Sequence, residues 1–185
     1  FARLSNRMII TRRHMLTTLA AATAMPALAK AGVPTAKSLA VQVVDGASAL
    51  PLKILNEQKE PVSLADWQGR WVVLSLWGPW CKQCKDEMPS VVRMTRALDK
   101  DHIQFLPLAF ERKGPWFVRK FLSDNGFDEL PVYMGNGRNL HDTLGLERLP
   151  TTAILTPDLQ HAYTITGEAV WDDAETIEWL NGLGR

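Results

Sequence analysis

The chain has 185 residues, 46 % of them hydrophobic, with no internal repeat and no low-complexity segment, which favours one globular domain with its own core. The net charge of +1 hides an asymmetry, because residues 1–29 contain four arginines and no acidic residue. The remainder has 17 basic and 20 acidic side chains, so we expect no nucleic-acid partner for the folded part.

Residues 1–29 have the pattern of an export signal. Arg12 and Arg13 precede a weakly apolar stretch rich in Ala and Thr, and the small residues of "ALA" at 27–29 complete the signal, with cleavage expected after Ala29. The apolar stretch of about 15 residues is shorter than the roughly 20 that a membrane-spanning helix needs. The sequence therefore predicts an exported, periplasmic protein.

Other features near the N-terminus refine this prediction. The adjacent arginines and Leu16 resemble a twin-arginine signal, although Met15 stands at its usual aromatic position. We expect residues 1–7 to lie upstream of the true start at Met8. Residues 30–48 are predicted to be a linker. The alternative for the whole segment is a basic, Ala-rich flank with no role in export.

After the predicted linker, apolar patterns predict alternating strands and helices. The apolar run at 70–77 is typical of a central strand buried on both faces, and Pro89 should kink the amphipathic helix that follows. Strands joined through helices must be parallel and the closely spaced final pair antiparallel, which predicts an α/β sandwich around a mixed sheet. The expected elements are a hairpin with strands at 52–55 and 62–64, a strand at 70–77, a helix at 81–99, a strand at 103–110, a helix at 115–126, an extended segment at 130–134, a short helix at 139–146, strands at 151–155 and 161–166, and a helix at 172–184.

The two cysteines of the chain stand three positions apart in "WGPWCKQCKDEMP", residues 77–89. Cys81 falls where the predicted strand ends and the helix begins, so unpaired backbone N–H groups and the helix dipole would stabilise a thiolate there. Cys84 lies one turn later, close enough to close a disulfide and facing the core. In an oxidising compartment, such a pair favours redox chemistry.

Two alternatives to redox chemistry exist for the cysteine pair: a zinc site and a purely structural disulfide. Half of a zinc site would need further ligands, and after residue 29 only His102, His141 and His161 remain, without a second C-x-x-C motif. A static disulfide across so short a loop would constrain the unfolded chain little and stabilise poorly. Redox work is therefore the favoured interpretation, with no metal site expected.

Three separated pieces of the sequence carry a family resemblance. They are "SLADWQGRWVVLSLWGPWCKQCKDEMPSV", "GLERLPTTAIL" and "TGEAVWDDAETIEWL", in this order. Over residues 50–183 the chain resembles thioredoxin-fold proteins, and more narrowly the TlpA/ResA group of exported thiol–disulfide oxidoreductases. The resemblance implies a thioredoxin-like three-layer sandwich over residues 49–185, with a mixed sheet, an N-terminal hairpin and a helical insertion in the central region.

The resemblance also implies catalytic roles. Cys81 would attack a disulfide of the partner, and Cys84 would then resolve the mixed disulfide. Glu87, one turn beyond Cys84, matches a glutamate credited in this group with acid–base help, whereas ordinary thioredoxins use an aspartate at the position of Ser75. A partly buried Glu87 with a raised pKa would accept the proton of Cys84. The alternative is an ordinary solvated helix glutamate.

A second group of residues is expected to bind the substrate. Pro150 should be the cis-proline beside the cysteines, Leu149 before it would pair with an incoming peptide strand, and Thr151 belongs to the same motif. The alternative is a trans loop proline. Trp80 is expected to form an apolar lip beside Cys81. Trp67, Trp71 and Trp77 are predicted to pack in the core or at sheet edges. Burial is also expected for Trp116 and Trp171, with a docking surface as the alternative.

The function implied by the resemblance is an exported, soluble, monomeric reductase. It would reduce disulfides in extracytoplasmic proteins, for example in cytochrome c maturation or copper-site assembly, with electrons from a membrane-bound thiol donor. The disulfide Cys81–Cys84 would be its redox centre, with no other cofactor. The dipeptide Lys82-Gln83 departs from the pairs common in this group, and a Lys82 charge that stabilises the thiolate would make the pair more oxidising. The sequence thus leaves the direction of electron flow open.

Two further classes of function remain as alternatives. A copper carrier would use the same thiolates as soft ligands, although no Met or His stands beside the pair to complete the site. A peroxidase would need the Thr-x-x-Cys motif of peroxiredoxins, and here Trp77 or Gly78 stands where the threonine is required.

Overall fold

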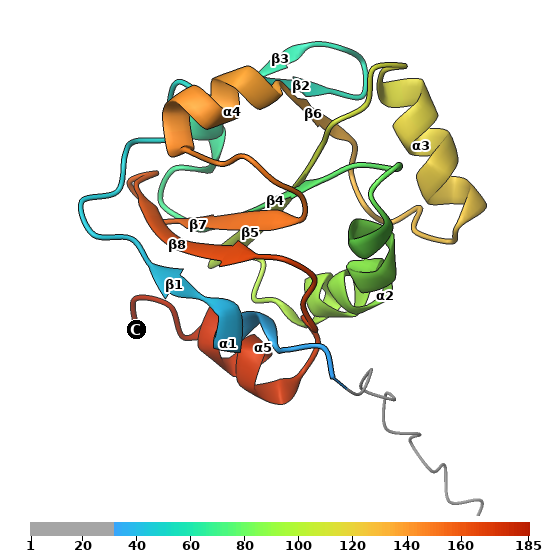
Figure 1. Cartoon of the computed structure of the whole chain (residues 1–185). Coiled ribbons are helices and arrows are strands. Elements are labelled where there is room, and N and C mark those ends of the chain that lie inside the picture. The colour runs from blue at the N-terminus through green and yellow to red at the C-terminus, as the bar shows by residue number, and fades with distance from the viewer. Residues whose placement is uncertain (1–31) are drawn as a thin grey trace, which may run out of the picture.

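The computed structural model describes residues 32–185, which form three layers around one eight-stranded mixed sheet (Figure 1). The strand order is β1-β8-β7-β4-β5-β6-β2-β3. The strands are β1 Val41–Gln42, β2 Ile54–Asn56, β3 Pro61–Val62, β4 Trp71–Trp77, β5 Ile103–Ala109, β6 Tyr133–Gly135, β7 Thr151–Leu155 and β8 His161–Thr166. The helices are α1 Ala36–Leu39, α2 Lys82–Ala97, α3 Pro115–Asp124, α4 Gly137–Leu144 and α5 Ala174–Asn181, with a 3-10 turn, η1, at Leu64–Trp67.

The centre of the sheet is buried on both faces, as the continuous apolar run predicts. Along β4, Val73 and Trp77 join the core under α2, α3 and α5, whereas Leu74 and Leu76 join the core under α4 and η1. Side chains of a strand point alternately to opposite faces, so a strand between two helical layers is apolar on both faces, and in β4 only the small Ser75 departs from this pattern. The three-layer mixed α/β fold is confirmed.

The topology brings the ends of the central strands together at one edge. β4 runs parallel to β5 through α2, and antiparallel to β7, whose Thr151 lies opposite Leu76. β7 and β8 form the expected antiparallel pair. The residues that follow β4 and those that precede β7 therefore lie at the same end of the sheet. These two segments carry the cysteine pair and the predicted cis-proline.

The helical insertion lies between α3 and β7. It consists of β6, which runs parallel to β5 and antiparallel to β2, and of α4, which packs on the face opposite α2 (Figure 1). The predicted hairpin is present with shorter strands than expected. Leu64 belongs to η1 rather than to the second strand, because the Ser63 side chain accepts a hydrogen bond from the Ala65 N–H and turns the chain.

The predicted linker at residues 30–48 is wrong over most of the part that the structure describes. Residues 36–39 form α1, and β1 pairs antiparallel with β8 at the edge of the sheet. Ala36 is fully buried. The composition of this segment is that of a linker, but backbone pairing with residues more than a hundred positions away holds it in place. It is part of the domain.

The predicted export signal lies outside the described residues. Within residues 32–185, no helix is both long enough and apolar enough to cross a membrane.

Candidate active site

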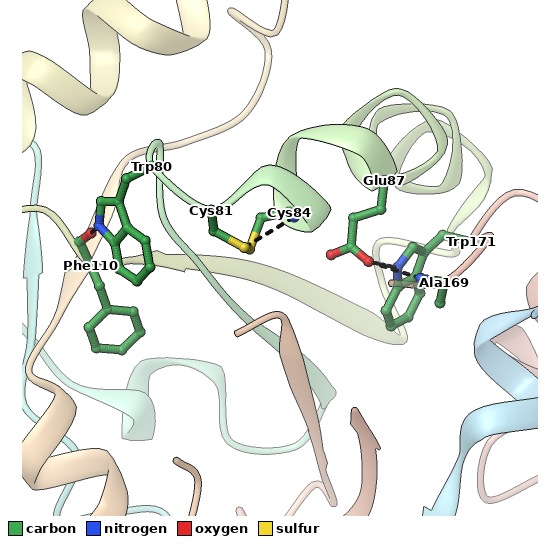
Figure 2. Close-up of a disulfide and its surroundings, with 7 residues drawn as sticks. All are labelled: Trp80, Cys81, Cys84, Glu87, Phe110, Ala169 and Trp171. Carbon is green, nitrogen blue, oxygen red and sulfur yellow. Dashed lines mark hydrogen bonds between the residues drawn. A yellow bond between two sulfur atoms is a disulfide. The ribbon is translucent and has the colours of Figure 1, made fainter. Parts of the chain in front are cut away.

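The two cysteines form a disulfide at the start of α2 (Figure 2). Their Cα atoms are 5.3 Å apart. Cys81 is the N-cap of the helix, and its sulfur accepts a hydrogen bond from the Cys84 N–H at 3.2 Å. The chain reaches this position from β4 through a turn in which the Cys81 N–H donates to the Gly78 carbonyl at 3.0 Å. The predicted pairing is confirmed.

The two sulfurs occupy different environments. Cys81 is 8 % exposed and Cys84 is 1 % exposed. A thiolate at the helix N-cap is stabilised by the N–H groups of the first turn and by the helix dipole. Cys81 is therefore the more accessible of the two and has the electrostatic support that an attacking thiolate needs, whereas Cys84 is almost fully enclosed. Lys82 is exposed and ion-paired with Asp86 at 2.5 Å.

Glu87 is the only buried carboxyl group among the described residues, and it lies one turn beyond Cys84. The residue is 5 % exposed. Figure 2 shows one carboxyl oxygen on the side that faces the disulfide and the other turned toward Ala169 and Trp171. Burial raises the pKa of Glu87 to about 8, and the charge of Glu168 acts in the same direction. The predicted burial of Glu87 is confirmed.

Two donors hold the carboxyl group from the far side. The Ala169 N–H donates to Oε2 at 3.1 Å, and the Trp171 indole Nε1–H donates to the same oxygen at 3.4 Å. One turn on, Ser90 accepts a hydrogen bond from the Trp171 N–H at 3.3 Å and donates to the Glu87 carbonyl at 2.8 Å. Both donors to Oε2 favour the charged carboxylate and oppose the effect of burial.

Sequence reasoning missed this set of partners. Trp171 is buried, as expected, but its indole N–H has a polar partner inside the core. Ala169 contributes only a backbone group, which no side-chain pattern reveals. One residue of the sequence could have indicated a polar contact here: Ser90 is a small polar residue on the buried, mostly apolar face of the helix.

The Leu149–Pro150 peptide bond is cis, as predicted. The Pro150 carbonyl accepts a hydrogen bond from the Gly167 N–H at 2.9 Å, which fixes the loop against the end of β8. Among the backbone hydrogen bonds of the described residues, none involves the N–H or the carbonyl of Leu149. Thr151 starts β7 and its hydroxyl is buried without a partner. The backbone groups of Leu149, next to the cis bond, therefore have no backbone partner among the described residues.

Trp80 lies on the side of the disulfide away from Glu87 (Figure 2). It is 64 % exposed, and its indole N–H donates to the Phe110 carbonyl at 2.9 Å. A groove of about 510 Å³ lies beside it, with Phe110, Leu146 and Leu149 among its apolar walls. A Cβ on Gly78 would lie 3.0 Å from the Trp80 ring and 3.1 Å from the Phe110 carbonyl oxygen, so a larger residue here would have to displace the ring by a few tenths of an ångström.

The remaining tryptophans follow the prediction except for one. Trp77 and Trp171 are buried, and Trp67 and Trp71 are partly buried, whereas Trp116 is 61 % exposed on α3. The expected burial of Trp116 is wrong because its position lies on the outer face of an amphipathic helix. In residues 32–185, no three His, Cys, Asp or Glu side chains are grouped so that they could hold a metal ion.

Residues 45–163 match the AhpC/TSA family, which is more than half of the chain. The chain belongs to the AhpC/TSA family. Among curated relatives, the thiol-disulfide oxidoreductase ResA of Bacillus anthracis is 25 % identical over 122 residues, which cover 66 % of this chain and 69 % of ResA. The family assignment, the ResA relatives and the disulfide at the helix N-terminus identify a thiol–disulfide oxidoreductase.

Solved structures confirm that the fold is thioredoxin-like. A thiol:disulfide interchange protein from Bacteroides sp. superposes with a TM-score of 0.60 at 18 % identity, covering 77 % of this chain and 94 % of its own. A thiol:disulfide interchange protein DsbE from Chlorobium tepidum gives a TM-score of 0.60 at 20 % identity, covering 76 % of this chain and 100 % of its own. The predicted resemblance to the TlpA/ResA group is confirmed.

Proposed function

We propose that this AhpC/TSA family protein reduces disulfides in other proteins outside the cytoplasm, with Cys81 as the attacking sulfur and Cys84 as the resolving one. The observation that carries the proposal is the asymmetry of the pair. Cys81 caps the helix on the side of Trp80, and Cys84 is enclosed on the side of Glu87. An oxidoreductase of this kind needs one sulfur that partners reach and one that they do not.

The proposed cycle starts from the dithiol form. The Cys81 thiolate attacks one sulfur of the client disulfide, which forms a mixed disulfide and releases one client thiolate. Cys84 then loses its proton and attacks the Cys81 sulfur, which releases the second client thiolate and closes the Cys81–Cys84 disulfide. Two electrons pass from the enzyme to the client, and two protons complete the client thiols. A thiol donor of the membrane would return the enzyme to its dithiol form.

Glu87 is proposed to take the proton of Cys84 in the resolving step. A free cysteine has a pKa of about 8.5, and a base works best when its own pKa lies near that of the proton donor and the working pH. The pKa of Glu87, raised by burial to about 8, meets this condition. An exposed glutamate with an ordinary pKa would be a far weaker base for a thiol.

The client is proposed to bind as an extended segment along the cis-proline loop. The backbone groups of Leu149, in the loop before β7, would pair with it in the manner of β-augmentation. Pro150 and Thr151 would shape this edge, and the apolar groove beside Trp80 would take a side chain of the client.

The compartment and the clients belong to the same proposal. The arginine pair, the short apolar stretch and the small residues of 1–29 support export to the periplasm. There the protein would act as a monomer on thiols of cytochrome c maturation or copper-site assembly, and would take electrons from a membrane-bound thiol donor. Mature protein that begins near Lys30 in a periplasmic fraction would support this assignment, and its absence from that fraction would contradict it.

A trapping experiment tests the order of attack. With Cys84→Ser, Cys81 should hold a client as a stable mixed disulfide, visible as a reducible adduct by mass spectrometry. With Cys81→Ser, the enclosed Cys84 should form far less adduct under the same conditions. Equal trapping by the two variants would contradict the proposed division of roles.

A further inference from the structure

A short extended segment separates the buried carboxyl group of Glu87 from the N-terminal part of the domain. We call residues 169–171 the sealing segment. Its Ala169 N–H and Trp171 side chain point to Glu87, and the Trp171 N–H points to Ser90, so one edge of the segment is bound to α2. In extended backbone, successive N–H groups point to opposite sides, so the groups of Val170 point away from α2.

The opposite edge of the sealing segment is bound by residues 34–42, which we call the N-terminal arm. The Val170 N–H donates to the Pro34 carbonyl at 2.9 Å, and the Ala36 N–H donates to the Val170 carbonyl at 2.8 Å. Thr35 and Val170 thus form a parallel bridge. Figure 2 shows the blue ribbon of this region beyond Ala169 and Trp171 as seen from Glu87.

The N-terminal arm is itself fixed to the domain at several points. Ala36 is fully buried in the same apolar cluster as Cys81, Cys84 and Trp171. The Lys37 N–H donates to the buried Thr176 hydroxyl at 3.3 Å, and β1 continues the arm along β8 (Figure 1). The arm is therefore a structural part of the layer that encloses Glu87.

We propose that the N-terminal arm positions the acid–base residue of the site by holding the sealing segment against Glu87. Ala36 and Val170 are then positioning residues, which touch neither client nor sulfur and act through Ala169 and Trp171. The effect on catalysis rests on the proposed role of Glu87, whereas the effect on the carboxyl group itself does not. The segment that sequence composition assigns to a linker thus helps to set the reactivity of the cysteine pair.

The arm acts through burial and backbone geometry rather than through charge. Its Lys37 is paired with Glu175 of α5 at 2.9 Å. The charged groups around Glu87 come from other elements. Glu168 precedes the sealing segment and raises the pKa of Glu87, and the Arg93–Asp172 ion pair lies at the segment's far end. On α2 itself, the nearest titratable group toward the disulfide is the Cys84 thiol of the reduced protein; the helix also carries Lys82, Lys85, Asp86, Arg93 and Arg96.

Loosening the arm should lower the pKa of Glu87. Burial raises this pKa to about 8 even though both donors of the sealing segment oppose it, so burial is the larger effect. A segment that separates from α2 admits water and removes the donors together. The net change is then toward the ordinary value of a glutamate.

The test uses the full chain with Ala36→Pro. Proline removes the N–H that Ala36 donates to Val170, at the first position of α1, where a helix accepts proline. Thr35 before it is already extended, at φ −73° and ψ 153°, as a residue preceding proline must be. The Glu87 carboxyl carbon is followed by ¹³C NMR against pH in the oxidised protein, where neither cysteine titrates. We expect its midpoint to fall by about one pH unit.

Lys37→Ala is the matched control, because it removes the ion pair of the arm with Glu175 and leaves the bridge to Val170 in place. Its midpoint should equal that of the unchanged protein. Ala36→Gly is the milder variant, which keeps the N–H but loosens the backbone, and it decides the question if the proline variant does not fold. It should shift the midpoint in the same direction by a smaller amount. An unchanged midpoint in the folded Ala36 variants would overturn the proposal.

A kinetic measurement distinguishes the failure of this proposal from the failure of the proposed function. In the unchanged background, Ala36→Pro should shift the pH profile of client reduction downward with the NMR midpoint. In the Glu87→Gln background, adding Ala36→Pro should not shift the pH profile further, so the double variant and Glu87→Gln alone should have the same profile. A midpoint that moves without any change in the profile would support the positioning by the arm and contradict the catalytic role of Glu87.

Discussion

The two sides of the disulfide differ in exposure to solvent and in the polar contacts of their residues. On one side Trp80 is exposed beside an apolar groove whose walls come from loops and from the insertion. On the other side Glu87 is enclosed by α2 and by residues 169–171, with its polar contacts made inside the protein. One side is suited to exchange partners, and the other is suited to hold a proton away from water. A single pair of sulfurs joins the two.

The largest effect on activity is expected from the removal of the more accessible sulfur, Cys81. Cys81→Ser should abolish disulfide reduction, because Cys84 alone is enclosed and no second thiol exists in the chain. The fold should remain, since a disulfide across three positions constrains the unfolded chain little. Turnover of insulin disulfides measures the first effect and circular dichroism the second. Retained turnover would exclude Cys81 as the nucleophile.

Changing the enclosed side should have the next largest effect. Glu87→Gln keeps the shape of the side chain and removes the base, so the resolving step should slow by about 100-fold at neutral pH. The first attack by Cys81 should change much less. Stopped-flow reduction of a client, resolved into adduct formation and release, measures both steps. If release keeps its rate and its pH dependence, the acid–base role of Glu87 is wrong.

The open side should affect client binding rather than chemistry. Trp80→Ala should raise KM for a protein client about tenfold, equivalent to about 1.4 kcal/mol, and leave the reduction of a small disulfide nearly unchanged. Trp116→Ala is the matched control, because Trp116 is similarly exposed but lies on α3 outside the groove. Equal effects of the two substitutions would mean that the groove does not select clients.

The last prediction concerns stability rather than activity. Because the pKa of Glu87 is raised in the folded protein, the native state holds a proton that the unfolded chain releases between about pH 4.5 and 8. The oxidised protein should therefore lose stability as pH rises through this window, by about 1.4 kcal/mol per pH unit from this group. Urea unfolding at several pH values measures the slope, and Glu87→Gln should remove this contribution. An identical slope in both proteins would contradict the burial of the carboxyl group.

The parts of the molecule that were predictable from sequence depend on local pattern or on family resemblance. The apolar pattern of residues 71–77 and of the helix that follows is enough to predict which of their side chains are buried. The disulfide between Cys81 and Cys84 follows from their spacing of one helical turn. The cis bond at Pro150 came from resemblance alone. These features need no knowledge of what packs against them.

The parts that sequence reasoning missed depend on pairing between distant residues. β1 is two residues long and pairs with β8, and so short a run does not show from its own residues which strand it pairs with. The donors to Glu87 come from residues 82 and 84 positions further along the chain, and one of them is a backbone group. Such long-range tertiary contacts determine the surroundings of Glu87. The sequence therefore predicted that side of the site less well than the side of Trp80.

Labelling of the reduced protein tests the difference between the two sulfurs most directly. A brief pulse of iodoacetamide at neutral pH, followed by peptide mass mapping, reports how fast each thiol reacts. Cys81 should be modified in the folded protein, and Cys84 should be modified only after unfolding. Equal modification of both thiols in the folded protein, or preferential modification of Cys84, would contradict the proposed roles of the two sulfurs.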